Sequence, residues 1–403
     1  MGALNRFAAV LTVLIFLIVP SAQISAADQP DYVVPVILSM TGSYAFSGKA
    51  EADGLKILED YTNVHGGIRG QKLHFKVYDD QSLPATDVSL AGQIIAQHPP
   101  VVLGSVGASQ CNALMPLFKD GPVLYCLMPA INPPSGGFVF AAQDAIDPYV
   151  AGMIRYLRLR GFGRIAVIST TDGSGQVDDA STARVLAMPD NKDLKVVAYE
   201  HFNPSDLSIA AQATHIKASG AQAVLVWASG TPFGTVLRGL NDAGLSSLPV
   251  ETTPANLHAD QLAQYLPFYP KELVIPGLPY MIPANAPKAL GPTPGMKIAI
   301  DELYDAYKMA NLPPDPGAAS SVWDPANMVI TALRKLGTGV TAVQMRDYLL
   351  GIHGTYSGVW GTYDFSTGDQ HGLTDQSVVL TEWDSKSGKF IGVSGLRGAP
   401  LPK

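Results

Sequence analysis

Small hydroxyl-bearing residues and glycines gather in four short stretches of this 403-residue chain. Each stretch follows an apolar run and precedes a helical pattern, which is where open α/β sheets bind ligands. Free backbone N–H groups and the dipole of the following helix favour an anionic group there. No stretch pairs a nucleophile with a base, so the pattern predicts binding and not an enzyme. The four stretches are Thr41–Gly48, Ser105–Gln110, Ser169–Gln176 and Ala228–Phe233.

The first stretch also carries two aromatic side chains, Tyr44 and Phe46. A site for phosphate alone does not require them, whereas aromatic rings pack well against apolar ligand surface. We therefore expect a small organic anion with an apolar body.

Motifs for catalysis, metals and nucleotides are missing from the sequence. No G-x-S-x-G, H-E-x-x-H or Walker pattern occurs. Gly173 and Gly175 begin like a dinucleotide loop, but Asp178 stands where the third glycine belongs. The eight histidines lack metal-ligand spacing, so we predict neither metal nor cofactor. Asp79 and Asp80 would point to opposite faces of a strand, which favours structural roles.

The composition is that of a large globular protein. Of all residues 47% are hydrophobic and 15% charged, which suits two or three packed domains. The formal net charge is −7, and the basic residues are scattered, which argues against nucleic acid as a partner.

The N-terminus has the pattern of a signal peptide, residues 1–27. Arg6 supplies the positive start, residues 7–19 are apolar, and Ser25–Ala27 offers small residues for cleavage. The alternative is an uncleaved membrane anchor, but the apolar run is short for a bilayer. We therefore expect an exported protein.

Export changes the interpretation of the two cysteines, Cys111 and Cys126. An isolated pair in an oxidising compartment usually bonds. Cys111 should open a helix and Cys126 should end the next strand, near the same sheet edge. We therefore favour a disulfide over two buried thiols.

Strand and helix patterns alternate along the chain, as in parallel sheets covered by helices. Two such series are separated near Gln143–Asp147, and further helices and a β-like end follow. The economical arrangement is two α/β lobes with a ligand cleft between them. The helices expected after the four stretches cover Ala50–Val64, Cys111–Lys119, Asp178–Ala187 and Thr235–Ala243.

Three runs of residues resemble the periplasmic branched-chain amino acid (Leu/Ile/Val) binding proteins. They are Leu38–Gly48, His65–Leu73 (HGGIRGQKL) and Tyr78–Asp80. Members of that family are solute receptors of ABC importers with the type I periplasmic binding fold. The resemblance covers essentially the whole mature chain. It implies two α/β lobes, each a mostly parallel sheet flanked by helices, joined by three hinge crossovers.

The resemblance also implies where the chain divides. Residues 28–145 and 280–357 would form the first lobe, and residues 146–279 and 358–403 the second. The crossovers would lie near Gln143–Asp147, Ile275–Tyr280 and Ser357–Thr362. The protein would work in the periplasm as a monomer with the membrane permease subunits of an ABC importer. A ligand-sensing ectodomain that acts with a membrane partner is the alternative.

The ligand positions of the family carry over only in part. The residues that hold an amino acid's carboxylate and ammonium match Ala108 and Asn132, and no acid follows the strand that ends near Thr253. A buried ammonium without a carboxylate would be costly. The lining therefore favours a carboxylate without an amine, similar to the aromatic acids bound by one branch of the family. Branched-chain or other amino acids remain the alternative.

The expected ligand-binding residues come from both lobes. They are Tyr44, Phe46, Ser105, Ala108, Ser109, Gln110, Ala130, Asn132, Ser174, Trp227, Ser229, Gly230, Thr231 and Thr253.

Overall fold

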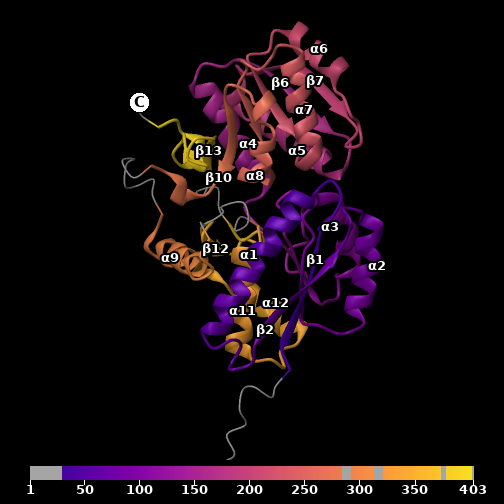
Figure 1. The fold of residues 1–403 in the computed structure, drawn as a ribbon, viewed down its shortest axis with the longest axis vertical. Helices are drawn as coiled ribbons and strands as arrows, with labels where there is room; N and C mark the ends of the chain where they lie inside the picture. The colour runs from indigo at the N-terminus through magenta and orange to yellow at the C-terminus, as the bar shows by residue number, and fades with distance from the viewer. Residues whose placement is uncertain (1–29, 284–291, 313–320, 374–377, 402–403) are drawn as a thin grey trace, which may run out of the picture.

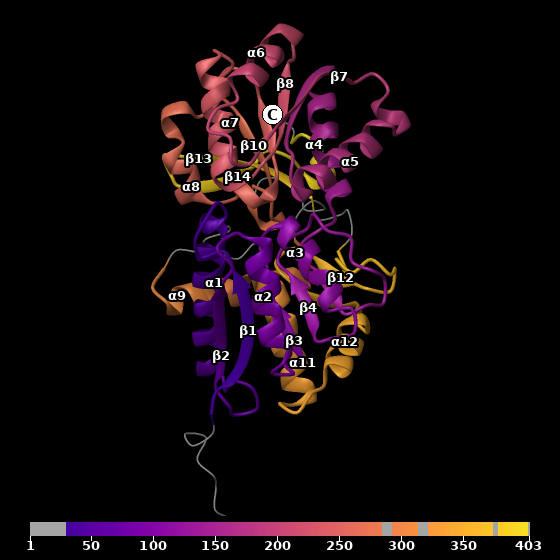
Figure 2. The same ribbon diagram turned by 90° about the vertical axis from the view of Figure 1, so that its right-hand side faces the viewer.

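The protein has two lobes stacked along its long axis (Figure 1). The computed structural model describes residues 30–283, 292–312, 321–373 and 378–401. The predicted signal peptide, residues 1–27, lies outside the described residues. Each lobe is built on one mostly parallel sheet flanked by helices, as predicted (Figure 2).

The first lobe contains a five-stranded parallel sheet in the order β2-β1-β3-β4-β5. Strands β1 and β3 are apolar and buried because helices cover both faces of a parallel sheet. The strands are β1 (Tyr32–Leu38), β2 (Leu73–Asp79), β3 (Val101–Leu103), β4 (Val123–Cys126) and β5 (Val139–Ala141). The helices are α1 (Ala45–Val64), α2 (Pro84–Ile95), α3 (Ala108–Leu114), α9 (Pro294–Met309), α11 (Trp323–Leu336) and α12 (Ala342–Leu350).

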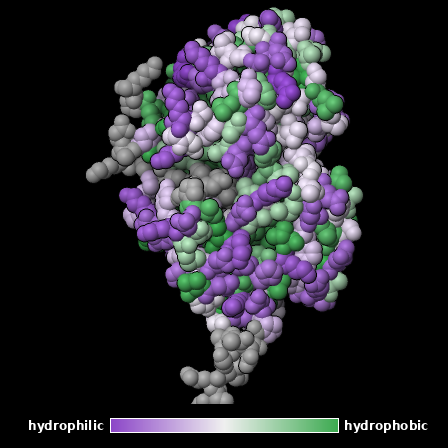
Figure 3. Space-filling view, viewed as in Figure 1, coloured by the Kyte–Doolittle hydropathy of each residue, from purple (hydrophilic) through white to green (hydrophobic). Residues whose placement is uncertain are grey.

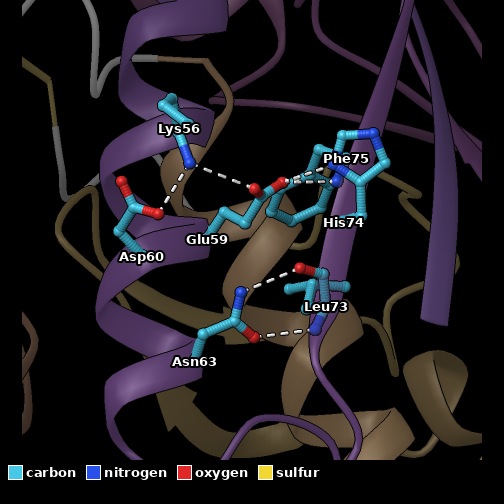
Figure 4. Close-up of polar contacts among 7 residues, drawn as sticks. All are labelled: Lys56, Glu59, Asp60, Asn63, Leu73, His74 and Phe75. Atoms are coloured by element: carbon cyan, nitrogen blue, oxygen red, sulfur yellow. Dashed lines mark hydrogen bonds and ion pairs between the residues drawn. The ribbon is translucent and has the colours of Figure 1, made fainter. Parts of the chain in front are cut away.

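Polar side chains fasten helix α1 to the edge strand β2 (Figure 4). The Asn63 amide donates to the carbonyl oxygen of Leu73 (2.9 Å) and accepts from its N–H (2.7 Å). One turn earlier, the Glu59 carboxylate accepts from the N–H of Phe75 (2.7 Å) and lies 3.2 Å from His74 Nδ1. These bonds satisfy backbone groups that an edge strand leaves unpaired, and they fix how α1 lies on the sheet.

The second lobe contains a seven-stranded sheet in the order β14-β13-β10-β9-β8-β6-β7. Strands β13 and β14 form an antiparallel pair beside β10, and the others are parallel. The strands are β6 (Arg164–Thr170), β7 (Lys195–Phe202), β8 (Ala223–Trp227), β9 (Val250–Thr252), β10 (Leu273–Gly277), β13 (Val379–Asp384) and β14 (Lys389–Gly392). The helices are α4 (Ile146–Leu159), α5 (Gly173–Leu186), α6 (Ala210–Ser219), α7 (Gly230–Asp242) and α8 (Ala259–Gln264).

Three crossovers between the lobes were predicted, and the positions of two of them need correction. The first crossing joins β5 to α4, at the predicted position near Gln143–Asp147. The second was expected at Ile275–Tyr280, but Ile282 still lies beside Gly392 of the second sheet. This crossing therefore falls between residue 282 and α9, a span that includes 284–291, outside the described residues. The third was expected at Ser357–Thr362, and this prediction is wrong.

The reason is a buried aspartate that holds this segment in the first lobe. Strands β11 (His353–Ser357) and β12 (Thr362–Asp364) form a hairpin there. The Asp324 carboxylate of α11 accepts from the N–H groups of Val359 (2.9 Å) and Trp360 (3.1 Å) and from the Tyr363 hydroxyl (3.0 Å). All four residues are buried. Residues 358–373 therefore belong to the first lobe, whereas Val378 already lies beside Gly152 of the second.

All four helices expected after the ligand stretches begin earlier than predicted, and α3 begins at Ala108 and not Cys111. Helix α1 begins at Ala45 and not Ala50, α5 at Gly173 and not Asp178, and α7 at Gly230 and not Thr235. Side chains stabilise two of these early turns. Ser82 Oγ accepts from the N–H of Tyr44, the residue before α1 (3.1 Å), and Asp172 caps α5 by accepting from the N–H of Gly175 (3.2 Å). The ligand loops are therefore shorter than expected.

The exposed surface mixes hydrophilic and hydrophobic residues on the face shown in Figure 3. Within the described ranges, no helix combines the length and the apolar character that crossing a membrane requires.

Candidate functional site

A cavity lies between the lobes, at the carboxyl ends of both sheets. The first lobe contributes Tyr44 and Met128. The walls enclose about 310 Å³, the mouth included, with room inside for about one water molecule. A larger ligand can enter and be accommodated only when the lobes or the lining side chains move apart, which the hinge motion of two-lobed proteins allows. The second lobe contributes Thr170, Ser174, Asp178, Trp227, Ala228, Ser229, Pro232 and Thr253.

Aromatic rings from both lobes meet at the cavity. Trp227 is 2% exposed, and its Nε1 donates to Thr182 Oγ1 (2.9 Å), which fixes the indole plane. The Tyr44 hydroxyl donates across the cleft to Asp172 Oδ2 (3.3 Å). Burial and the Asp172 carboxylate raise the pKa of Tyr44, so its hydroxyl stays protonated at neutral pH. Together with Met128, Ala228 and Pro232, the rings form the apolar part of the lining.

One carboxyl group lines the cavity, from the second lobe. Asp178 is 5% exposed and lies one turn after Ser174 in α5. Within the part of the chain that the structure describes, its carboxyl group has no hydrogen bond or ion pair. Burial, with Asp179 and Asp172 nearby, raises the pKa of Asp178 well above its ordinary range. The neutral form is therefore favoured, and it can donate a hydrogen bond.

Two helices direct their N-termini at the cavity. Ser174 is the second residue of α5, and Ser229 is the N-cap of α7. The Ser174 hydroxyl is buried without a hydrogen-bond partner among the described residues, and Ser229 makes no capping hydrogen bond. Helix N-termini with available donors favour a negatively charged group. The described lining contains no Lys or Arg, so these donors and Asp178 provide its polar chemistry.

The lobes touch around the cavity, so this is a closed arrangement. The N–H of Thr231 donates to the carbonyl oxygen of Ser43 across the cleft (3.5 Å). Ser47 Oγ lies 3.4 Å from His258 Nε2 of the other lobe. Gly230 has a φ of +63°, and a Cβ atom there would lie 2.3 Å from the Ser43 oxygen. The approach of the lobes at this point depends on a residue without a side chain.

Buried polar residues of the first lobe bind one another and not the cavity. Ser105 Oγ donates to one oxygen of Asp80 (2.6 Å) and Ser39 Oγ to the other (2.7 Å). Gln110 Nε2 donates to Ser39 Oγ (3.1 Å). Burial and the neighbouring Asp80 raise the pKa of Asp87 to about 8. The network ties together the ends of β1, β2 and β3, which is the structural role predicted for Asp80.

Comparison with known proteins shows the family. Residues 31–389 match the periplasmic binding proteins. The chain belongs to the periplasmic binding protein family. It is 27% identical over 233 residues to "Leu/Ile/Val-binding protein homolog 3" of Brucella melitensis, a match that covers 56% of this chain and 61% of that protein. The match thus spans less than two thirds of the length of that relative.

Solved structures share the fold. An extracellular ligand-binding receptor from Rhodopseudomonas palustris superposes with a TM-score of 0.75 at 20% identity, covering 91% of this chain and all of the other. A fatty acid ABC transporter substrate-binding protein from Thermomonospora curvata gives a TM-score of 0.73 at 17% identity, covering 91% and 92%. At these identities the likeness concerns the fold alone.

This periplasmic binding protein brings part of the predicted site together. The cavity is lined by five of the predicted residues, Tyr44, Ser174, Trp227, Ser229 and Thr253. Two others, Gly230 and Thr231, lie at the contact between the lobes.

The remaining predicted residues lie outside the cavity lining. Phe46 lies in the first turn of α1 and lines a separate groove with His258. Ser105 and Gln110 are held in the Asp80 network, and Asn132 is exposed. The residues Ala108, Ser109 and Ala130 do not line the cavity, although Ser109 lies close to Gly173 of the other lobe.

Five lining residues were absent from the expected set: Met128, Thr170, Asp178, Ala228 and Pro232. Of these, Thr170, Ala228 and Pro232 fall within two of the four stretches. Asp178 was the most consequential omission, because the argument for an amine-free ligand assumed that no second-lobe acid reaches the site. Placing the start of α5 at Asp178 separated this residue from Ser174. With Asp172 recognised as the N-cap, the i, i+4 spacing of Ser174 and Asp178 would have placed them on one face.

The two cysteines of this binding protein form a disulfide, Cys111–Cys126, with Cα atoms 6.1 Å apart. Both are fully buried, and the bond joins α3 to the end of β4. It therefore fixes the first-lobe wall next to Met128. Among the described residues, no group of three or more His, Cys, Asp or Glu could hold a metal ion.

Acid is expected to lower the free energy of unfolding, because His258 is buried as a neutral ring. Burial lowers the pKa of His258 to about 4, whereas an unfolded histidine titrates near about 6.5. The stabilisation by the neutral ring is complete above the unfolded value and is lost as pH falls from about 6.5 to about 4. We expect His258→Gln to remove up to about 3 kcal/mol of the pH dependence of the unfolding free energy across this window.

Urea unfolding at a series of pH values tests this expectation. His98→Gln, a substitution of an exposed histidine in the first lobe, serves as the control and should leave the pH dependence unchanged. An identical acid profile for His258→Gln and the unmodified protein would contradict the assignment.

Proposed function

We propose that this protein is the substrate-binding receptor of an ABC importer in the periplasm. In this proposal it works as a monomer, closes its two lobes on a small organic ligand and presents it to the permease subunits. The observation that carries the proposal is the enclosed cavity, which is lined from both lobes and contains hydroxyls and one carboxyl group but no nucleophile–base pair. The names of the related proteins agree with a transport role.

The ligand that we propose is a small carboxylate with an aromatic body. Tyr44, Met128 and Trp227 supply apolar surface for a ring. Ser174 and Ser229 supply hydroxyls at two helix N-termini, where a carboxylate is favoured. A protonated Asp178 adds a further donor to the same carboxylate.

A second candidate is a ligand that carries an amine, such as an amino acid. Asp178 favours it, because a buried carboxyl group without a partner would ionise when an ammonium comes within hydrogen-bond distance. The name of the curated relative from Brucella melitensis points in the same direction. The two candidates require opposite protonation states of Asp178, and this difference can be measured.

Substitutions of Asp178 separate the candidates. For an aromatic acid we expect Asp178→Asn to keep the dissociation constant within about threefold, because the amide also donates, and Asp178→Ala to raise it about tenfold. Affinity for the acid should fall as pH rises through the raised pKa of Asp178, since ionised Asp178 repels a carboxylate. Asp178→Asn should be insensitive to this pH change. Calorimetry with benzoate, phenylpyruvate, phenylalanine and leucine supplies the measurement, after a thermal-shift screen.

Asp242→Asn is the matched control, because Asp242 is an exposed acid of the same lobe. It should bind every compound as the unmodified protein does. If leucine or phenylalanine binds, benzoate and phenylpyruvate do not, and Asp178→Asn weakens binding tenfold or more, the amine-bearing ligand replaces the aromatic acid. If the protein turns over any of these compounds, the transport proposal fails.

A further inference from the structure

A second concave site lies on the second lobe, away from the cleft. It follows helix α4, which is about 20 Å long, and offers about 1240 Å³ of space with its open side included. None of its lining residues belongs to the cavity between the lobes. We call it the arginine groove. Its lining consists of Asp147, Pro148, Ala151, Gly152, Arg155, Arg158, Met188, Pro189, Asp190, Asn191 and Arg397.

One wall of the arginine groove is a tight contact between α4 and the end of the chain. The turn η8 (Leu396–Gly398) lies on α4 at Gly152. A Cβ atom on Gly398, whose φ is +72°, would lie 2.0 Å from the Gly152 carbonyl oxygen. This close approach holds Arg397 beside α4. The wall is therefore a fixed part of the fold.

The charge of the arginine groove is positive although the whole chain is negative. Arg155 and Arg158 are three residues apart, so they lie on one face of α4 with Cβ atoms about 5 to 6 Å apart. Neither has an ion pair within the described ranges, and Arg158 Nε is buried without a hydrogen-bond partner there. Asp147 is occupied by Arg184, whose Nε donates to it at 2.9 Å. Asp190 is the one other acid in the lining.

Unpaired guanidinium groups have a clear chemical preference. Each presents a planar set of donors that matches a carboxylate or phosphate group. A buried donor without a partner is unfavourable, so a rotation of the Arg158 side chain that brings Nε to a ligand oxygen would be stabilising. Pro148, Ala151 and Met188 add apolar surface between the charges. The lining therefore suits a carbon skeleton with more than one anionic group.

We propose that the arginine groove binds a small organic polyanion, one with at least two carboxylate or phosphate groups, independently of the cleft ligand. Arg155 and Arg158 each engage one anionic group, and Arg397, held beside Gly152, borders the same groove. The apolar residues contact the skeleton.

Citrate is the probe for this site, and inorganic phosphate is the comparison with a single anionic group. At low ionic strength we expect saturable binding of one citrate, and phosphate weaker by about tenfold or more. Arg155→Gln and Arg158→Gln should each raise the citrate dissociation constant about fivefold, and the double variant should abolish saturation. The Arg158 Nε–H signal in NMR spectra should shift during the titration.

Arg238→Gln is the matched control. Arg238 is an exposed arginine of the same lobe that packs over Phe268. Its substitution changes the net charge by the same amount as each single groove variant and leaves the residues of the arginine groove unchanged. The proposal is overturned if citrate does not saturate, if phosphate binds as well as citrate, or if Arg238→Gln weakens binding as much as the groove variants. Citrate binding that survives in the double variant would place the ligand elsewhere and would also overturn it.

Discussion

Gly230→Ala is expected to raise the dissociation constant of the cleft ligand by about 30-fold or more, while both lobes stay folded. The added Cβ atom would lie 2.3 Å from the Ser43 carbonyl oxygen of the opposite lobe, far inside van der Waals contact. Because Ser43 precedes α1 and Gly230 begins α7, neither backbone can move without shifting a helix. The lobes would therefore stop short of the closed arrangement.

The cost of backbone strain must be separated from the steric clash with Ser43, because Gly230 has a φ of +63°. An alanine in that conformation costs about 1 to 2 kcal/mol in any context. Gly388→Ala is the control, since Gly388 has a φ of +69° in the same lobe and nothing within 4 Å of its Cβ position. Both variants should lose similar stability, and only Gly230→Ala should lose affinity.

Small-angle scattering provides the direct measurement of closure. With a saturating compound from the ligand panel, the unmodified protein and Gly388→Ala should reach the smaller radius of gyration of the closed form. Gly230→Ala should keep the larger value. Equal compaction of all three proteins would show that closure does not pass through the contact between Gly230 and Ser43.

Asp324→Ala is expected to lower the free energy of unfolding by about 3 to 5 kcal/mol. Its carboxylate accepts from the N–H groups of Val359 and Trp360 and from the Tyr363 hydroxyl, and all these groups are buried. Alanine would leave three donors without a partner, and each would carry its desolvation penalty. The hairpin of β11 and β12 should then detach from the first lobe.

Urea unfolding at neutral pH, together with hydrogen exchange, tests this effect. Exchange of the Val359 and Trp360 amides should become faster before the strands of the first sheet open. Asp301→Ala, which removes an exposed acid from α9 in the same lobe, should change stability by less than about 0.5 kcal/mol. A comparable small loss for Asp324→Ala would mean that water replaces the carboxylate at low cost.

Regular elements with strong local patterns were predictable from the sequence. The apolar run before the first stretch forms the strand β1, Tyr32–Leu38, because such a run is buried on both faces in a central parallel strand. The disulfide between Cys111 and Cys126 followed from the isolated pair and the expected export. The sequence motifs that suggested the family are supported by a match over residues 31–389.

Helix starts and crossovers at the cleft were harder to predict. Helix α5 starts five residues before its predicted beginning because Asp172 caps it, and the following Gly-Ser-Gly run resembles a loop in sequence. The third crossover was misplaced because Asp324, distant in sequence, holds residues 359–363 in the first lobe. Local propensity contains no information about such a contact.

For the site, the sequence by itself determined the two-lobed α/β fold and the use of strand-end loops, since strand ends of parallel sheets collect at one edge. Five of the residues that it suggested for the site line the cavity: Tyr44, Ser174, Trp227, Ser229 and Thr253. Only the tertiary structure decided that Ser105 and Gln110 belong to the Asp80 network and that Asp178 enters the cavity. The physical reason is that a hydroxyl, amide or carboxyl group binds whichever partner packing brings within hydrogen-bond distance, and packing between two lobes depends on residues far apart in the chain.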